Sequence, residues 1–386
     1  MRERLTSIDL LRGIVMIIMA IDHTRDFFYF PGADPTDLAT TSPELFFTRW
    51  ITHYCAPVFV FLAGIGAFLS TLRGKTPKEL SWFLLTRGVW LIILELTLVR
   101  SGWMFTLTDF HMLVGQVIWA IGWSMVALSA LVFLPVRVIG IFGVVMILIH
   151  NAFDSIQVNW QNPLGWLWAI LHTGNILTPV NGVRFLPLYP LIPWIGVMAA
   201  GYAFGLFYTK PADVRNKQLR IVGLSLIGAF ILLRAINIYG DPSPWLLQKN
   251  VVFNVLSFLN CSKYPPSLCY LLMTLGPAIL FLSFAERFKG SLTKIPIVFG
   301  RVPMFYYLLH VPLIHGLSVL FEYIRTGDAT WMLSGNLFTA TPPADFGYGL
   351  PAMYAVWLLV IAILYPLCLW YSKLKMQSKN PLLSYL

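Results

Sequence analysis

Hydrophobic stretches of about twenty residues recur from one end of the chain to the other, separated by short polar or Pro- and Gly-rich stretches. A helix of about twenty apolar residues is long enough to cross the hydrocarbon core of a bilayer. We therefore predict an all-α integral membrane protein, a polytopic bundle of about ten transmembrane helices forming one domain over residues 1–386. The predicted spans are residues 8–28, 52–72, 82–99, 112–134, 136–150, 187–208, 219–239, 266–285, 302–323 and 350–371.

Two longer polar connections interrupt this pattern. Residues 29–50 are rich in Pro, Asp and Thr, a composition that favours a loop. Residues 151–184 contain too many Gly and Pro residues for one helix, and their tryptophans suit a lid at the membrane interface.

Composition and charge place the protein in a membrane. The chain is 58% hydrophobic and only 11% charged, whereas a soluble domain carries about a quarter charged residues. The net charge of +10 does not indicate a nucleic-acid partner, because in a membrane protein the location of the basic residues matters more than their sum. Of the 27 Lys and Arg residues, 19 fall on the side of the N-terminus and 8 on the other. The positive-inside rule then predicts cytoplasmic termini in a multi-pass protein of the cell (inner) membrane.

The first predicted span carries a stripe of functional groups along one face. Its members follow one another at spacings of three or four residues, which places them on one side of a helix. They are Asp9, Arg12, Met16, Met19, His23 and Asp26. Asp9 and His23 are separated by about 21 Å at 1.5 Å per residue. Charged groups near both membrane surfaces on one helix face indicate a shared, partly hydrated cavity.

His23 is the leading candidate for chemistry. Asp22 and Asp26 lie within one helical turn of it, and a neighbouring carboxylate can orient an imidazole and raise its basicity. The competing interpretation is a polar helix end at the water interface. His53, at the start of the second span, is a further candidate, although a histidine beside a tyrosine is also common at an interface.

Three arginines at the membrane ends of their spans are candidates for binding phosphate: Arg12, Arg87 and Arg301. Long basic side chains also reach from a span to the interface simply as anchors, and that interpretation stays open here.

We expect no metal site. The seven histidines show neither H-x-x-x-H nor H-E-x-x-H spacing, and the four cysteines show no C-x-x-C spacing. We expect the cysteines to be free thiols packed as small apolar residues.

The motif around the first span resembles a known group of membrane enzymes. The pattern Arg4-x-x-x-Ile8-Asp9-x-x-Arg12-Gly13, with His23 fourteen positions after Asp9, resembles the first-span signature of acyltransferase family 3. A fuller resemblance is to the bacterial relatives of heparan-alpha-glucosaminide N-acetyltransferase. It extends over nearly the whole chain and is carried by the runs SIDLLRGIVMIIMAIDHTRDFF, HYCAPVFVFLAG, RFLPLYPLIPWIGVMAAGYAFG, KYPPSLCYLLMTLGPA and FGRVPMFYYLLHVPLIH.

This resemblance implies an enzyme that takes an acetyl group from acetyl-CoA at the cytosolic face. The group passes to an amine or hydroxyl of a sugar or glycan on the outer side. By position, His23 and Arg12 match the histidine and the first-span arginine of family 3, with Asp9 in the same motif. In the lysosomal enzyme the catalytic histidine lies in the loop before the second span, where His53 is the nearest histidine here. The resemblance therefore leaves both His23 and His53 as candidates.

Two functions follow from these residues. In an acyltransferase, His23 serves as general base or transient acyl carrier, while Arg12 and Arg301 hold the phosphates of coenzyme A. The alternative is a proton-coupled transporter or flippase of a sugar-linked or acidic substrate, with Asp9, Glu95 and His23 as a proton relay. The two halves of the chain show no matching pair of broken helices, which argues against the transporter. The acceptor, N- versus O-acylation, the acyl length and the oligomeric state, a dimer included, stay open.

Overall fold

The structure is a computed structural model. It describes residues 5–106, 108–156, 158, 162–180, 182–333, 342–343, 345–378, 380 and 383. Within these residues the chain is a bundle of helices with one small three-stranded sheet, which confirms the predicted fold class. Eight helical segments are long and apolar enough to cross a membrane: Pro43–Thr71, Pro77–Met104, Val136–Phe153, Leu191–Thr209, Ala212–Ile236, Leu268–Arg287, Pro303–Thr326 and Leu350–Gln377.

Two predicted spans fall outside this set of eight, each for its own reason. The first corresponds to α1 (Thr6–Phe28), which is long enough but carries the charges of the stripe. The fourth corresponds to α6 (Val117–Leu131), an apolar helix of 15 residues. The remainder of that predicted span is different, since residues 112–114 form a strand.

The first half of the chain, as far as the structure describes it, contains eight α-helices and three short helical turns. Their bounds are α1 (Thr6–Phe28), α2 (Pro43–Thr52), α3 (Cys55–Thr71), α4 (Pro77–Leu94), η1 (Glu95–Val99), α5 (Arg100–Met104), α6 (Val117–Leu131), α7 (Val136–Ile149), η2 (His150–Phe153), α8 (Pro163–Trp168) and η3 (Ala169–Thr173). Contrary to the loop predictions, α2 occupies part of residues 29–50, and α8, η3 and two strands occupy part of residues 151–184.

The second half is built from longer helices. They are α9 (Leu191–Phe204), η4 (Gly205–Thr209), α10 (Ala212–Ile236), α11 (Val251–Leu259), α12 (Leu268–Leu282), η5 (Ala285–Arg287), α13 (Ser291–Arg301), α14 (Pro303–Thr326), η6 (Thr330–Leu333) and α15 (Leu350–Gln377). The sheet has β3 (Val183–Leu186) in the middle, parallel to β1 (Met112–Val114) and antiparallel to β2 (Leu177–Val180).

Local sequence fixes where several helices begin. Thr76 and Glu79 form a reciprocal cap at the start of α4: the Glu79 amide donates to Thr76 Oγ1 (3.3 Å), and the Thr76 amide donates to the Glu79 carboxylate (2.8 Å). A proline break separates α2 from α3. Pro57 has no N–H, so the carbonyl of His53 lacks a helical partner and accepts instead from the Tyr270 hydroxyl at 2.8 Å.

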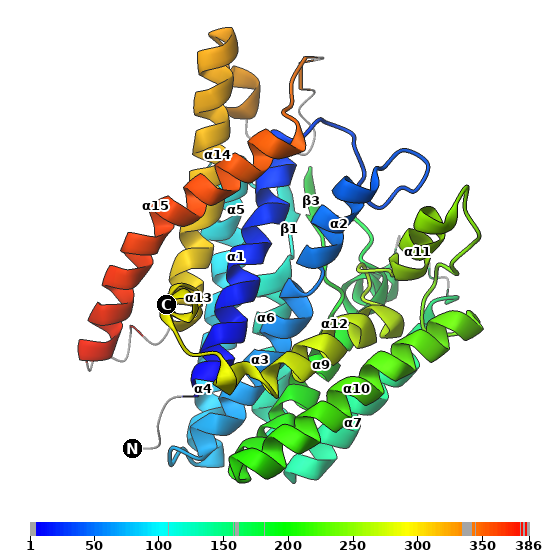
Figure 1. The fold of residues 1–386 in the computed structure, drawn as a ribbon, viewed down its shortest axis with the longest axis vertical. Coiled ribbons are helices and arrows are strands. Elements are labelled where there is room, and N and C mark those ends of the chain that lie inside the picture. The colour runs from blue at the N-terminus through cyan, green and yellow to red at the C-terminus, as the bar shows by residue number, and fades with distance from the viewer. Residues whose placement is uncertain are drawn as a thin grey trace.

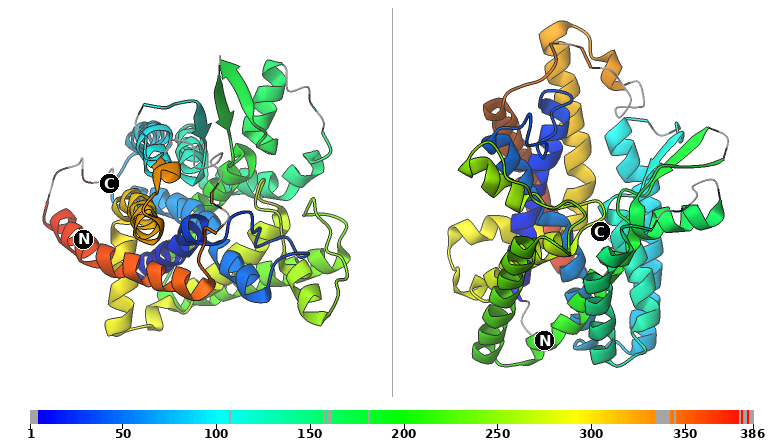
Figure 2. Two further views of the ribbon diagram at one scale, coloured as in Figure 1. Left: turned by 90° about the horizontal axis from the view of Figure 1, so that it is seen from above. Right: turned by 90° about the vertical axis from the view of Figure 1, so that its right-hand side faces the viewer.

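Helix α1 runs through the middle of the bundle (Figure 1). It packs along α13 and also contacts α2, α3, α14 and α15. The crossing with α13 depends on two glycines, because a side chain on Gly13 would strike the backbone of Pro296, and one on Gly300 would strike the backbone of Asp9. Figure 2 shows the strands β2 and β3 and helix α8 projecting from the side of the bundle.

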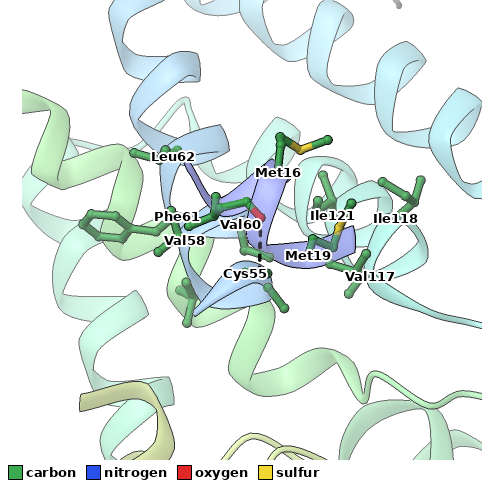
Figure 3. Packing of buried hydrophobic residues seen from close by; sticks show 14 of the residues in the cluster. Met16, Met19, Cys55, Val58, Val60, Phe61, Leu62, Val117, Ile118 and Ile121 are labelled. Atoms are coloured by element: carbon green, nitrogen blue, oxygen red, sulfur yellow. Dashed lines mark hydrogen bonds between the residues drawn. The ribbon is translucent and has the colours of Figure 1, made fainter. Parts of the chain in front are cut away.

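Beside this crossing lies the hydrophobic core between α1, α3 and α6 (Figure 3). Met16 and Met19 of α1 face apolar residues of α3 and α6 there, and both methionines are almost fully buried. The Cys55 thiol donates to the carbonyl of Val15 at 3.3 Å, which ties the start of α3 to α1. All four cysteines are free and buried, as the sequence predicts.

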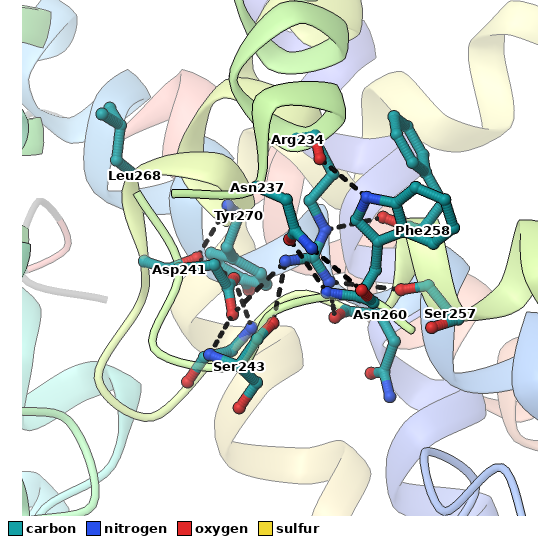
Figure 4. A network of polar contacts seen from close by, with 12 residues as sticks. Arg234, Asn237, Asp241, Ser243, Ser257, Phe258, Asn260, Leu268 and Tyr270 are labelled. Carbon is teal, nitrogen blue, oxygen red and sulfur yellow. Dashed lines mark hydrogen bonds and ion pairs between the residues drawn. The ribbon is translucent and has the colours of Figure 1, made fainter. Parts of the chain in front are cut away.

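A buried arginine organises the loop between α10 and α12 (Figure 4). Arg234 donates to the backbone carbonyls of Phe258, Ser243, Ser257 and Asn260 at 2.8–3.2 Å, and its Nη1 lies 3.7 Å from Asp241 Oδ1. Asp241 in turn accepts from the Ser267 hydroxyl (2.6 Å) at the start of α12. This network fixes the segment that carries Lys263 and Tyr264.

Candidate active site

Three cavities follow one another along the stripe of α1. Neighbouring cavities share lining residues: Phe59, Val117 and Tyr307 line both the first and the second, and His23 and Lys263 are among those that line both the second and the third. Five of the six stripe residues face this row, namely Arg12, Met16, Met19, His23 and Asp26. The stripe therefore borders one row of cavities from the charged start of α1 to its polar end.

The first cavity has a volume of about 330 Å³ and a basic rim. Its lining includes Arg12, Arg87, Arg301 and Lys375, contributed by α1, α4, α13 and α15. The structure thus brings together the three arginines that the sequence places at membrane ends. Lys375 was missed, because in the sequence it is simply one basic residue after the last span.

Arg12 is held in place at this rim. Its Nη1 donates to the carbonyl of Gly300 at 3.0 Å and lies 3.4 Å from Asp9 Oδ1. Asp9 itself is buried. A guanidinium fixed in this way beside two other arginines and a lysine suits a ligand with several phosphate oxygens.

The second cavity is a constriction of about 30 Å³ between the two larger cavities. His23 and Met19 of α1 line it, together with Phe59 of α3, Val117 of α6 and Tyr307 of α14. Groups from four helices therefore close around a single imidazole.

The third cavity has a volume of about 620 Å³ and is lined by many polar groups. Its charged lining residues are Asp22, Arg25, Asp26, Arg49, Arg184 and Lys263. The sequence did not single out Lys263, Arg49, Arg184, Tyr189 and Tyr264, because they come from loops, a helix end and the strand β3, far apart along the chain. Burial raises the pKa of the Tyr264 phenol, but Lys263 and Arg49 outweigh burial and bring that pKa below its ordinary value. This end of the row therefore favours negative charge.

His23 lies between two aromatic side chains and one carboxylate. Its ring is edge-on to Trp103 of α5, with the centroids 4.9 Å apart, and lies 5.1 Å from the ring of His310. His23 Nδ1 is 4.0 Å from Asp26 Oδ2, which is too far for a hydrogen bond, and Asp26 Oδ1 accepts from Arg25 Nη2 at 2.7 Å. His310 Nδ1 donates to the carbonyl of Tyr307 at 2.7 Å, which leaves its Nε2 as the acceptor nitrogen.

Asp22 lines the constriction together with His23, and its carboxylate is also paired with basic side chains. Arg25 Nη2 lies 2.6 Å from its carboxylate, Arg49 Nη1 contacts it directly, and Lys263 Nζ is 4.0 Å away. The carboxylate is thus occupied by three cations from α1, α2 and the loop before α12. Its observed contacts hold these cations at the third cavity, whereas Asp26 is the nearer carboxylate to His23 Nδ1.

His53 lies outside the row of cavities. It is at the α2–α3 break, only 2% exposed, with its ring 5.3 Å from that of Tyr270. Its neighbours Thr52 and Cys55 line the constriction, but His53 lines none of the three cavities.

One cluster with the composition of a metal site lies apart from this row. Ligand atoms of His150, Asp154 and His172 lie within 4.8 Å of one another. The expectation of no metal relied on histidine pairs at helical spacing, and these two histidines are 22 residues apart. The signal in the sequence was a histidine and an aspartate at i and i+4, in His150-Asn151-Ala152-Phe153-Asp154.

A family model described as heparan-alpha-glucosaminide N-acetyltransferase, catalytic, matches residues 4–240. The matched residues include Asp9, Arg12, His23, His53 and Arg87, while Arg301 and Lys375 follow them in the chain. The comparison with curated proteins yields no match.

Proposed function

The chain belongs to the family of heparan-alpha-glucosaminide N-acetyltransferase catalytic domains, and on this premise we propose that it carries acetyl groups from cytosolic acetyl-CoA to an outer acceptor. The acceptor is an amine or hydroxyl of a sugar or glycan. The observation that supports the proposal is the row of cavities, in which a basic cavity and a polar cavity meet at His23.

The donor binds at the basic rim. Arg12, Arg87 and Arg301 are the groups for the phosphates of coenzyme A, and Lys375 joins them. Asp9 contributes by orienting Arg12. Arg12 and His23 are 11 residues apart, or about 16 Å along the helix axis. An extended pantetheine arm is long enough to bring a thioester to the constriction while the charged nucleotide stays near water, where its solvation is retained.

Transfer takes place at His23. As a general base, the imidazole accepts the proton of the acceptor N–H or O–H while that atom attacks the thioester carbonyl. The carbon–sulfur bond then breaks, and the proton passes to the leaving thiolate to give free coenzyme A. As an acyl carrier, the same imidazole attacks the thioester, the carbon–sulfur bond breaks and coenzyme A leaves as its thiolate. The acceptor then attacks the acetyl carbon, the carbon–nitrogen bond to the ring breaks, and the acceptor's proton passes to the thiolate. The carboxylates of Asp22 and Asp26, both close to the ring, favour the protonated imidazole in either route, and Trp103 and His310 restrict its orientation.

Sided vesicles test the proposal. Purified protein is reconstituted, vesicles of one orientation are selected, and acetyl-CoA is supplied on the side of the N-terminus with an amino-sugar acceptor on the other. We expect free coenzyme A to appear on the donor side and acetylated acceptor on the opposite side. Movement of the acceptor without coenzyme A release would instead support the transporter, and transfer only with both substrates on one side would exclude a route through the protein.

A further inference from the structure

His150, Asp154 and His172 lie together at the outer end of α7, apart from the three cavities. His150 begins η2, Asp154 follows that turn, and His172 comes from η3. The two histidines are at most 1% exposed. We propose that these three side chains bind one divalent transition-metal ion of the zinc class.

The chemistry of the donors supports this assignment. Two imidazoles and one carboxylate form a ligand set typical of zinc, iron, copper and nickel, whereas magnesium and calcium prefer sites made of oxygen atoms. Tetrahedral zinc binds imidazole nitrogen at about 2.0–2.1 Å, which places its ligand atoms about 3.4 Å apart. The ligand atoms here lie within 4.8 Å of one another, so modest side-chain rotations would bring them to that spacing.

The hydrogen bonding of the cluster points to a ligand as well. Among the residues that the structure describes, neither ring nitrogen of the buried His150 has a hydrogen-bond partner, nor does Nδ1 of the buried His172. A buried imidazole without partners costs free energy, because its nitrogens have lost their hydrogen bonds to water and have formed none within the protein. A metal ion would give the His150 ring a partner for one of its two nitrogens.

Asp154 is already oriented as a ligand would be. Its Oδ2 accepts from Asn151 Nδ2 at 2.8 Å, and its Oδ1 is 3.0 Å from His172 Nε2. Asn151 in turn accepts from the amide of Leu268 at 2.9 Å, at the start of α12. Such outer contacts orient the ligands of metal sites. When a metal replaces the contact between His172 and Asp154, the bond to the ring nitrogen forms with release of any proton held between the two groups.

The position of the site indicates a structural role. The metal would fasten η3 to the end of α7. The segment after η3 includes Ile176, Arg184 and Leu186, which line the third cavity. Three described protein ligands leave a coordination position for water or a further ligand.

Metal content gives a direct test that does not depend on acetyl transfer. Full-length protein is purified in detergent with an affinity tag that uses no metal, dialysed against a chelator, and then supplied with Zn²⁺, Mg²⁺ or Ca²⁺. We expect on the order of one tightly bound zinc ion per chain by mass spectrometry. Zinc should raise the Tm of the chelated protein by about 3 °C or more, and magnesium and calcium should not.

Variants locate the site. His172→Ala should abolish zinc binding, and Asp154→Asn, which keeps the size of the side chain, should weaken it at least about tenfold. His111→Ala is the matched control, because His111 is an exposed histidine of the same outer region, and it should bind zinc like the natural chain. The proposal is overturned if chelated protein shows no zinc uptake and no change in Tm, or if folded Asp154→Asn protein binds zinc as tightly as the natural chain.

Discussion

The two candidate histidines differ in what surrounds them. His23 lines the constriction and the third cavity and has Asp26 at 4.0 Å, whereas the ring of His53 lies against Tyr270 at the proline break. We expect His23→Ala to lower turnover by about 100-fold or more while acetyl-CoA binding stays nearly intact, since a general base acts in the chemical step. Coenzyme A release measures turnover, and calorimetry measures binding.

The His53→Ala variant completes this comparison. Folded His53→Ala protein should keep most of the activity of the natural chain, because the imidazole lines none of the three cavities. Loss of turnover in folded His53→Ala, together with substantial turnover in His23→Ala, would assign the catalytic role to His53 instead.

Arg12 should affect the binding of acetyl-CoA and not the rate of the chemical step. A hydrogen bond to a charged group contributes about 1.5–3 kcal/mol, so Arg12→Ala should weaken acetyl-CoA binding by roughly 10- to 100-fold. Arg137→Ala is the control, since Arg137 is exposed at the start of α7 and lines none of the three cavities. Equal affinities of the two variants in calorimetry would remove Arg12 from the donor site.

The polar side chains of the site show which contacts can be predicted from the sequence. Spacing on one helix was enough to align Arg12, His23 and Asp26, because a single helix fixes their relative directions. It was not enough to find Lys263 or Arg49, which reach Asp22 from other parts of the chain. The contact between residues so distant in sequence depends on how the loops fold, and no local pattern encodes it.

The first turn of helix α6 is capped by a residue from another element. Glu95 of η1 is 1% exposed, and its Oε2 accepts from the amides of Ile118 (3.0 Å) and Trp119 (3.2 Å) in the first turn of α6. Its carboxylate therefore caps a helix from a neighbouring element. This role accounts for a buried carboxyl group that the transporter hypothesis assigned to a proton relay.

Removal of this cap should cost stability. Loss of an N-cap acceptor costs about 0.5–2 kcal/mol, so we expect Glu95→Ala to lower the Tm, while Glu95→Gln, whose amide oxygen still accepts, should lower it less. Thermal unfolding in detergent measures both. A Glu95→Gln variant as unstable as Glu95→Ala would mean that the charge, and not the acceptor, matters here.

The sequence predicted which helices exist better than it predicted where they begin and end. The apolar run over residues 112–134 gave the expected helix only from Val117, since Gly115 separates the helix from the strand β1. The residues of β1 pair with residues of β3 that are 72 positions further along the chain. The helix α2 was missed because its polar start resembles a loop, although Ser42 and Pro43 are a cap followed by a favoured first residue.

For the whole molecule, the sided distribution of basic residues predicts the topology. Reporter fusions after Lys78 and after Lys217 should report the cytoplasm, and fusions near Asp37 and Asp345 should report the exterior. The donor and acceptor sides of the proposed reaction depend on this orientation. A cytoplasmic signal at Asp37 would reverse the map and place the basic cavity outside.

The small volume of the constriction at His23 has an electrical consequence. About 30 Å³ has room for only one or two water molecules, too few for a continuous file of water across the membrane. In the reaction that we propose, an acetyl group would pass this constriction while ions and protons are held back, so that the membrane would keep its proton gradient. A Phe59→Ala substitution, which removes a ring from this wall, should make proteoliposomes leak protons faster than Phe47→Ala, a change at an exposed phenylalanine. A trapped pH-sensitive dye would record the difference, and equal leak rates would place the barrier elsewhere.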